Sequence, residues 1–108
     1  METILKGRLV TNTGPIIALM LINHLDILRK LFDEVLISEE VNKELLQGKK
    51  FPDFKSIIQV TLYEQEQWIK IKSLNNPLNP LISSVLDIGE ASVIQLAQEI
   101  GADFVLID

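Results

Sequence analysis

The sequence contains no cysteine, which excludes disulfide bonds, zinc sites built on thiolates and a cysteine nucleophile. It contains one histidine, His24, so a serine-based triad has a single candidate base. No apolar run reaches the roughly 20 residues that a membrane-spanning helix needs. Residues 1–8 also lack the basic-then-apolar layout of a secretion signal. These absences predict a cytoplasmic protein that does not use a membrane.

Basic residues are fewer than acidic ones, with 10 Lys and Arg against 15 Asp and Glu and a formal net charge of −5. This balance disfavours a duplex-DNA binder, which would neutralise phosphates with a basic face. An acidic protein can still contact nucleic acid through a metal ion, because the ion supplies the positive charge. A glycine-rich phosphate loop is also missing, which weakens the alternative of an unrelated doubly wound module that binds a nucleotide or another protein.

Aliphatic residues dominate what is present: 47% of the chain is hydrophobic and only 6% is aromatic. A chain of 108 residues can build one core but not two. Residues 1–108 are therefore expected to form a single domain, and many aliphatic and few aromatic side chains suit a sheet covered by helices.

Short, unbroken apolar runs alternate with segments of helical period along the chain. This order predicts an α/β fold with a central parallel sheet covered on both faces. Thr13 or Gly14 is expected to cap the first helix. Residues 51–67 match a helix moderately well, but residues 57–62 could equally form a strand. Strands are expected at 9–11, 35–37, 68–72 and 104–107, and helices at 16–22, 24–32, 38–48 and 87–101. A turn-rich break at 75–80 is expected to be followed by a short helix that ends at residue 85.

Four oxygen-bearing side chains lie at or beside the predicted strand ends. Asn12 follows the first strand and Asp108 ends the last. Glu44 lies on the helix after the second strand, and Glu90 lies in the first turn of the helix before the last strand. In parallel sheets, chemistry lies beyond the carboxyl ends of the strands. If the first and last strands are neighbours, Asn12 and Asp108 lie side by side, with Glu90 close to them.

Carboxylates gathered in this way repel one another unless a cation lies between them. Mg²⁺ or Mn²⁺ suits such a site, because hard cations prefer oxygen ligands. A bound ion of this kind can activate water and neutralise charge on a phosphate, so the pattern is compatible with phosphodiester hydrolysis.

Four segments together resemble the PIN-domain family over nearly the whole chain. Residues 10–19 (VTNTGPIIAL) resemble its opening strand and helix start, and residues 35–45 (VLISEEVNKEL) resemble its second strand and glutamate-bearing helix. Residues 86–97 (LDIGEASVIQLA) and 102–108 (ADFVLID) are similar to an uncharacterised prokaryotic branch related to VapC-type toxin ribonucleases.

The resemblance implies a three-layer α/β/α sandwich and Mg²⁺- or Mn²⁺-dependent cutting of single-stranded RNA. It also implies a toxin held inactive by an antitoxin protein. Carried over by position, Glu44, Glu90 and Asp108 would be catalytic, and Asn12 would join them as a metal ligand.

Two departures from the family pattern matter. Asn12 stands where the family usually has Asp, which removes a negative charge and should weaken metal binding. The sequence also ends at Asp108, where the family usually continues, so the last elements are expected to be lacking. A bare sheet edge would then be open to pairing, which predicts a homo-oligomer. Both departures favour the alternative of a catalytically silent PIN-like module that binds RNA or protein.

Several residues also have structural explanations. Asp87 and Glu90 match a capping box, so Glu90 could serve the helix alone. Trp68 is expected in the core. The lysines are mostly solvated surface, but if RNA binds, the expected phosphate contacts are Lys43, Lys49 and Lys50, with Lys70 and Lys72 as a second pair.

Overall fold

The computed structural model describes residues 6–48, 52–65 and 67–108. The strands form one four-stranded sheet in the order β3-β2-β1-β4, and every neighbouring pair is parallel. The elements are β1 (Arg8–Thr11), α1 (Thr13–Leu21), α2 (Asp26–Leu31), β2 (Glu34–Ser38), α3 (Glu39–Gln47), a 3₁₀ turn (Pro52–Phe54), α4 (Lys55–Gln65), β3 (Ile69–Lys72), α5 (Pro80–Ser83), α6 (Ile88–Ile100) and β4 (Phe104–Leu106).

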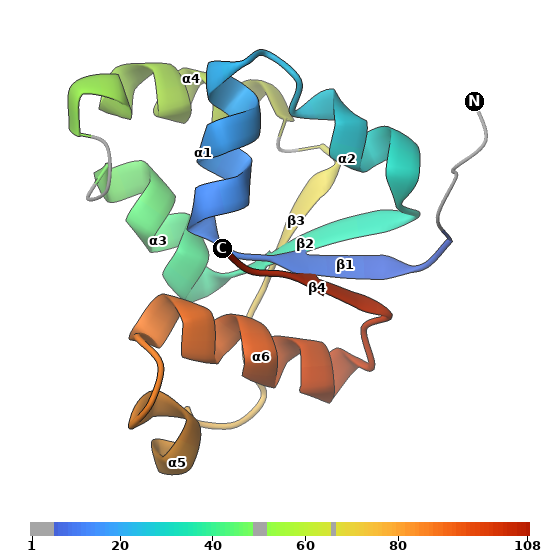
Figure 1. The fold of residues 1–108 in the computed structure, drawn as a ribbon, viewed down its shortest axis with the longest axis vertical. Coiled ribbons are helices and arrows are strands. Elements are labelled where there is room, and N and C mark those ends of the chain that lie inside the picture. The colour runs from blue at the N-terminus through green and yellow to red at the C-terminus, as the bar shows by residue number, and fades with distance from the viewer. Residues whose placement is uncertain (1–5, 49–51, 66) are drawn as a thin grey trace.

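The helices cover the sheet in layers, as the sequence predicts. In Figure 1, α1, α2 and α4 lie on one side of the sheet, and α6 lies on the other side with α5 beneath it. Helix α6 contacts β1, β2 and β4, while α3 contacts α1, α4 and α6. The three-layer α/β/α sandwich with a parallel sheet is therefore confirmed. Across the parts of the chain that the structure describes, no helix is long and apolar enough to cross a membrane.

Local sequence signals explain both ends of α3 and α6, the helices that carry Glu44 and Glu90. Ser38 caps α3 by accepting a hydrogen bond from the Val41 backbone N–H at 3.1 Å. Asp87 caps α6 in the same way, accepting from the Glu90 backbone N–H at 2.8 Å. Gly48 and Gly101 end these helices in the left-handed conformation, which glycine adopts without strain.

Three expectations need correction or a decision. Helix α1 begins at Thr13, so its cap residue is Asn12 rather than Thr13 or Gly14. The Asn12 side chain makes no capping bond, and its Nδ2 donates to Asp108 instead. The ambiguous stretch is helical, as α4. Trp68 lies in the turn before β3 instead of in the strand, although its ring still packs against the core.

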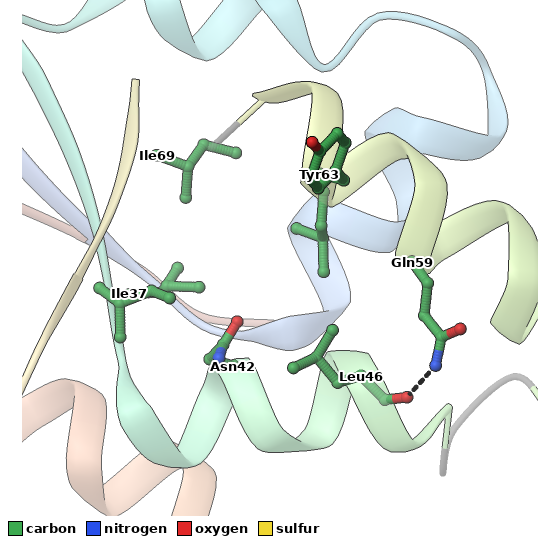
Figure 2. A pocket seen from close by; sticks show the side chains of 8 residues that line it. Ile37, Asn42, Leu46, Gln59, Tyr63 and Ile69 are labelled. Atoms are coloured by element: carbon green, nitrogen blue, oxygen red, sulfur yellow. Dashed lines mark hydrogen bonds between the residues drawn. The ribbon is translucent and has the colours of Figure 1, made fainter. Parts of the chain in front are cut away.

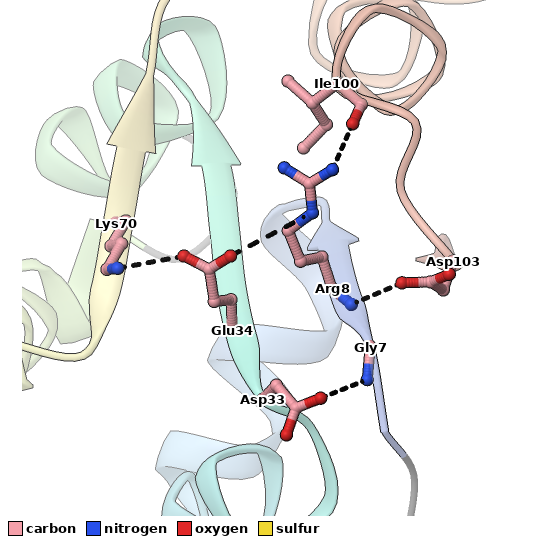
Figure 3. Close-up of polar contacts among 7 residues, drawn as sticks. All are labelled: Gly7, Arg8, Asp33, Glu34, Lys70, Ile100 and Asp103. Carbon is pink, nitrogen blue, oxygen red and sulfur yellow. Dashed lines mark hydrogen bonds and ion pairs between the residues drawn. The ribbon is translucent and has the colours of Figure 1, made fainter.

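The amino ends of the strands are held by a polar network, shown in Figure 3. The backbone N–H of Gly7 donates to Asp33 at 2.7 Å, and that of Arg8 donates to Asp103 at 2.9 Å. The Arg8 guanidinium also donates to the carbonyl of Ile100. These contacts pair polar groups at the starts of the strands and so serve the fold.

Strand β4 is an outer strand of the sheet described here, and its Phe104 and Val105 are 37% and 42% exposed. Among the described strands, β4 has a neighbour on one side only, β1, so its other edge is unpaired there. The ring of Phe104 meets Phe32 edge to face, with centroids 5.3 Å apart. Pairing of this edge with a second copy stays a prediction.

Candidate functional site

Asn12 and Asp108 meet at the carboxyl edge of the sheet. Strands β1 and β4 are neighbours in register, with Thr11 beside Leu106. The Asn12 backbone N–H donates to the Leu106 carbonyl at 3.1 Å, and its side-chain Nδ2 donates to Asp108 Oδ1 at 2.7 Å. The strand order thus places these two residues together, which is the condition that the sequence argument required.

The other polar atom of the Asn12 side-chain amide, Oδ1, has no hydrogen-bond partner among the described residues. Asn12 is 2% exposed, and its Oδ1 is buried without a hydrogen bond. Burying a polar oxygen unpaired is unfavourable, so an acceptor in this position suits a donor or a cation that the protein itself does not supply. This oxygen is the feature of the structure that best fits a metal ion.

Glu44 is held beside Asn12 by the next residue along the chain. The hydroxyl of Thr13, itself 1% exposed, donates to Glu44 Oε2 at 2.7 Å. The carboxylate rests on Gly89 in the first turn of α6: a Cβ added to Gly89 would stand 2.9 Å from Glu44 Cδ and closer still to Oε1. Glu44 therefore links α1, α3 and α6.

A second glycine receives the Asp108 carboxylate. A Cβ added to Gly14 would stand 3.0 Å from Asp108 Oδ1 and closer still to Oδ2. Gly14 and Gly89 do not have positive φ angles, so close approach explains these glycines rather than backbone conformation. Each carboxylate thus occupies the space above a glycine, which we call its seat: Gly14 for Asp108 and Gly89 for Glu44. The Cβ of any larger residue at either position would fill this space.

Glu90 follows Gly89, so its backbone lies next to the seat of Glu44. The bond from its N–H to Asp87 is one half of the predicted capping box. Its side chain is partly buried. The structure thus places Glu90 on the correct helix turn, and its predicted role as a ligand stays a prediction.

The carboxylates are not gathered into one cluster. In residues 6–48, 52–65 and 67–108, no group of three or more Asp, Glu or His side chains is arranged to hold a metal ion. Like charges repel, and two of the three carboxylates are instead held by neutral donors, Asp108 by Asn12 and Glu44 by Thr13. Oxygen ligands of this kind fit a hard cation. For all three carboxylates to bind one ion, the side chains of Glu44, Glu90 and Asp108 would have to turn toward a common point.

The predicted phosphate-binding lysines are placed only in part. Lys43 is exposed on α3, next to Glu44 in the chain. Lys49 and Lys50 lie outside the described residues. Lys70 bonds Glu34 at 2.9 Å, near the opposite end of the sheet, which separates it from the candidate site.

A separate apolar cavity lies between α3, α4 and the outer strand β3 (Figure 2). It has a volume of about 270 Å³, and none of the predicted site residues lines it. The Gln59 side chain closes one side by donating to the Leu46 carbonyl at 2.8 Å. The other lining residues are Ile37, Asn42, Leu62, Tyr63, Ile69 and Ile71.

Sequence reasoning gave Thr13 and Gly14 only a possible capping role, and it gave Gly89 no role. A signal is present for two of them, because Thr13 follows Asn12 in the chain and Gly89 precedes Glu90. A hydroxyl residue next to a candidate ligand could have been predicted to donate a hydrogen bond to a carboxylate, and a glycine to leave room for one.

Fold and site define a class of protein: an α/β fold with oxygen-bearing side chains at the carboxyl edge of a parallel sheet. A family model described as the PIN domain matches residues 8–108, and the chain belongs to that family. No curated protein and no solved structure matches the chain. PIN domains in general have nuclease-type functions, use divalent metals and bind RNA.

Proposed function

We propose that this protein is a metal-dependent endoribonuclease that cuts single-stranded RNA with Mg²⁺ or Mn²⁺. The observation that carries the proposal is that two neighbouring residues where β1 ends each bond a carboxylate, Asn12 that of Asp108 and Thr13 that of Glu44. The unpartnered oxygen of Asn12 points to the same chemistry, since it is a hard ligand without a partner.

Each residue has a role in this proposal. Asn12, Glu44, Glu90 and Asp108 supply oxygen ligands, and the three carboxylates are the catalytic groups. A divalent ion held there would activate water and neutralise charge on the phosphate. Thr13 keeps the Glu44 carboxylate in one orientation through its 2.7 Å hydrogen bond.

RNA would be held through few basic side chains. The net charge of −5 leaves little attraction for phosphates apart from the ion. Lys43, next to Glu44 on α3, would supply phosphate contacts, and so would Lys49 and Lys50, which follow α3 in the sequence. RNA should therefore bind weakly when no metal ion is present.

A second candidate function is a silent PIN-like module that binds RNA or protein without cutting. The bond between Asn12 and Asp108 favours it, because an amide replaces a carboxylate and pairs with its neighbour. The lack of a three-carboxylate group in the described part of the chain favours it as well.

The two candidates are separated by cutting assays on labelled single-stranded RNA, with Mn²⁺ and with chelator. The enzyme proposal expects manganese-dependent cutting that is lost in Glu90→Gln and kept in Asp26→Asn. Asp26 is a matched control, because it also loses one negative charge but lies in an exposed ion pair with Lys30 at 3.1 Å. No cutting by the natural chain or by Asn12→Asp would establish the silent module instead.

We also propose that the protein acts in the cytoplasm as the toxin of a toxin–antitoxin pair and forms a homo-oligomer. The resemblance of residues 86–97 and 102–108 to a prokaryotic branch supports the first part, and the exposed outer strand β4 supports the second. Growth arrest on expression, absent in Glu90→Gln, tests the toxin role. Light scattering of the purified protein tests the oligomer.

A further inference from the structure

Two buried serines join α3 to α6. Ser38 and Ser92 are both fully buried, and their Oγ atoms are 2.7 Å apart. The Ser92 hydroxyl donates to the Gly89 carbonyl at 2.6 Å, and the Val41 backbone N–H donates to Ser38 Oγ at 3.1 Å. Since Ser92 gives its proton to Gly89, the proton between the two hydroxyls comes from Ser38.

The result is a directed chain of hydrogen bonds through the core. It runs from the Val41 N–H to the Ser38 hydroxyl, then to the Ser92 hydroxyl and finally to the Gly89 carbonyl. Each hydroxyl both accepts and donates, so neither is left unsatisfied in an apolar setting.

The two ends of this series of hydrogen bonds belong to α3 and α6, which also carry residues of the candidate site. Helix α3 carries Glu44, and the first turn of α6 carries Gly89 and Glu90. Gly89 is the residue on which the Glu44 carboxylate rests. A shift of α6 along α3 would therefore change the distance between Glu44 and Glu90.

We propose that Ser92, acting with Ser38, is a positioning residue that fixes the first turn of α6 against Glu44 and so sets the spacing of Glu44 and Glu90. Ser92 touches neither carboxylate; it acts through the Gly89 peptide. The inference rests on the proposed function, because the spacing matters for an ion shared by both residues.

Packing alone would not require this pair. Alanine is the better helix former at an interior position such as 92, and it would leave no hydroxyl to satisfy. A serine there gains from its bond to Ser38, which lies 54 residues earlier in the chain. That bond couples two helices rather than stabilising one.

The test compares Ser92→Ala with Ser92→Thr, since a threonine hydroxyl in a helix can also bond the carbonyl one turn earlier. Ser83→Ala is the matched control, because its hydroxyl makes the same type of bond, to the Pro80 carbonyl at 3.3 Å, on the surface. Mn²⁺ affinity is measured by calorimetry, and kcat and KM are measured with single-stranded RNA.

Ser92→Ala should weaken Mn²⁺ binding on the order of 10-fold, the lower end for residues that orient metal ligands. It should lower kcat with little change in KM for RNA, and Ser92→Thr should restore much of both. Ser83→Ala should change neither. A Ser92→Ala variant that is less stable but keeps its Mn²⁺ affinity and kcat would overturn the proposal.

A metal-free measurement separates this proposal from the proposed function. If the natural chain neither binds Mn²⁺ nor cuts RNA, the proposed function fails, and positioning is then decided by stability. Ser92→Ala and Thr13→Val should act non-additively on the unfolding equilibrium, because both release the Glu44 carboxylate from its seat. Additive effects, with unchanged amide NMR signals of Glu44, would contradict a positioning role.

Discussion

Replacing Gly89 by alanine should reveal how closely the Glu44 carboxylate is seated. Gly89 has no positive φ angle, so alanine would not strain the backbone. In a helix interior, alanine is favoured over glycine by about 1 kcal/mol, which is an upper limit for Gly89 in the first turn of α6. If nothing rested on Gly89, the substitution would therefore stabilise the protein.

The structure predicts the opposite sign. The new Cβ would stand 2.9 Å from Glu44 Cδ, inside the 3.4 Å at which ordinary contact begins, so the carboxylate must move. Movement breaks its bond from Thr13, and a hydrogen bond to a charged group contributes about 1.5–3 kcal/mol. Since the gain in helix propensity is at most about 1 kcal/mol, Gly89→Ala should cost about 0.5–3 kcal/mol.

Truncating Glu44 should reverse this effect. In a Glu44→Ala background the seat is empty, so Gly89→Ala should be stabilising, by up to about 1 kcal/mol. Denaturant unfolding of the four proteins without metal measures the coupling between the positions. Equal stabilisation by Gly89→Ala in both backgrounds would refute the seating of Glu44 on Gly89.

Two further predictions concern other carboxylates. Asn12→Asp would set two carboxylates where an amide donates to Asp108 at 2.7 Å, so the metal-free protein should lose about 1–3 kcal/mol and gain more Tm from Mn²⁺ than the natural chain. Thermal unfolding with and without Mn²⁺ checks this, and an unchanged response to Mn²⁺ would contradict it. The backbone N–H of Asn75 lowers the pKa of Glu99 below its ordinary value of 4.5. A lowered folded-state pKa adds stability that is present above about pH 4.5 and lost as the pH falls through the folded pKa. In Glu99→Gln, the free energy of unfolding should therefore fall less steeply as the pH is lowered below about 4.5, which urea unfolding across that range measures. An equally steep fall in the variant would count against this role.

Elements with local signals at both ends could be predicted from the sequence. Ser38 and Gly48 delimit α3, and Asp87 and Gly101 delimit α6, because capping depends on residues within one turn. The parallel sheet followed from short apolar runs between helices. The rule that chemistry lies beyond the strand ends then placed Asn12 beside Asp108 once β1 and β4 proved to be neighbours.

Features decided by tertiary packing could not be predicted in this way. Residues 57–62 fit either period, and the choice of helix shows only in packing: Ile58 is buried, while Ile57 and Val60 are exposed. The seat of Glu44 on Gly89 depends on how α3 lies against α6. The bond between Ser38 and Ser92 depends on the same contact, and no sequence spacing encodes it.

The central claim is tested most directly by adding Mn²⁺ to isotopically labelled protein and recording which backbone amide signals broaden, since a bound paramagnetic ion relaxes the nuclei closest to it. A metal site at the carboxyl edge predicts that the signals of Asn12, Gly14, Gly89 and Asp108 broaden first, at the lowest Mn²⁺ concentration. Broadening that begins at the exposed carboxylates Asp26 or Asp53 and leaves these four signals sharp would contradict it.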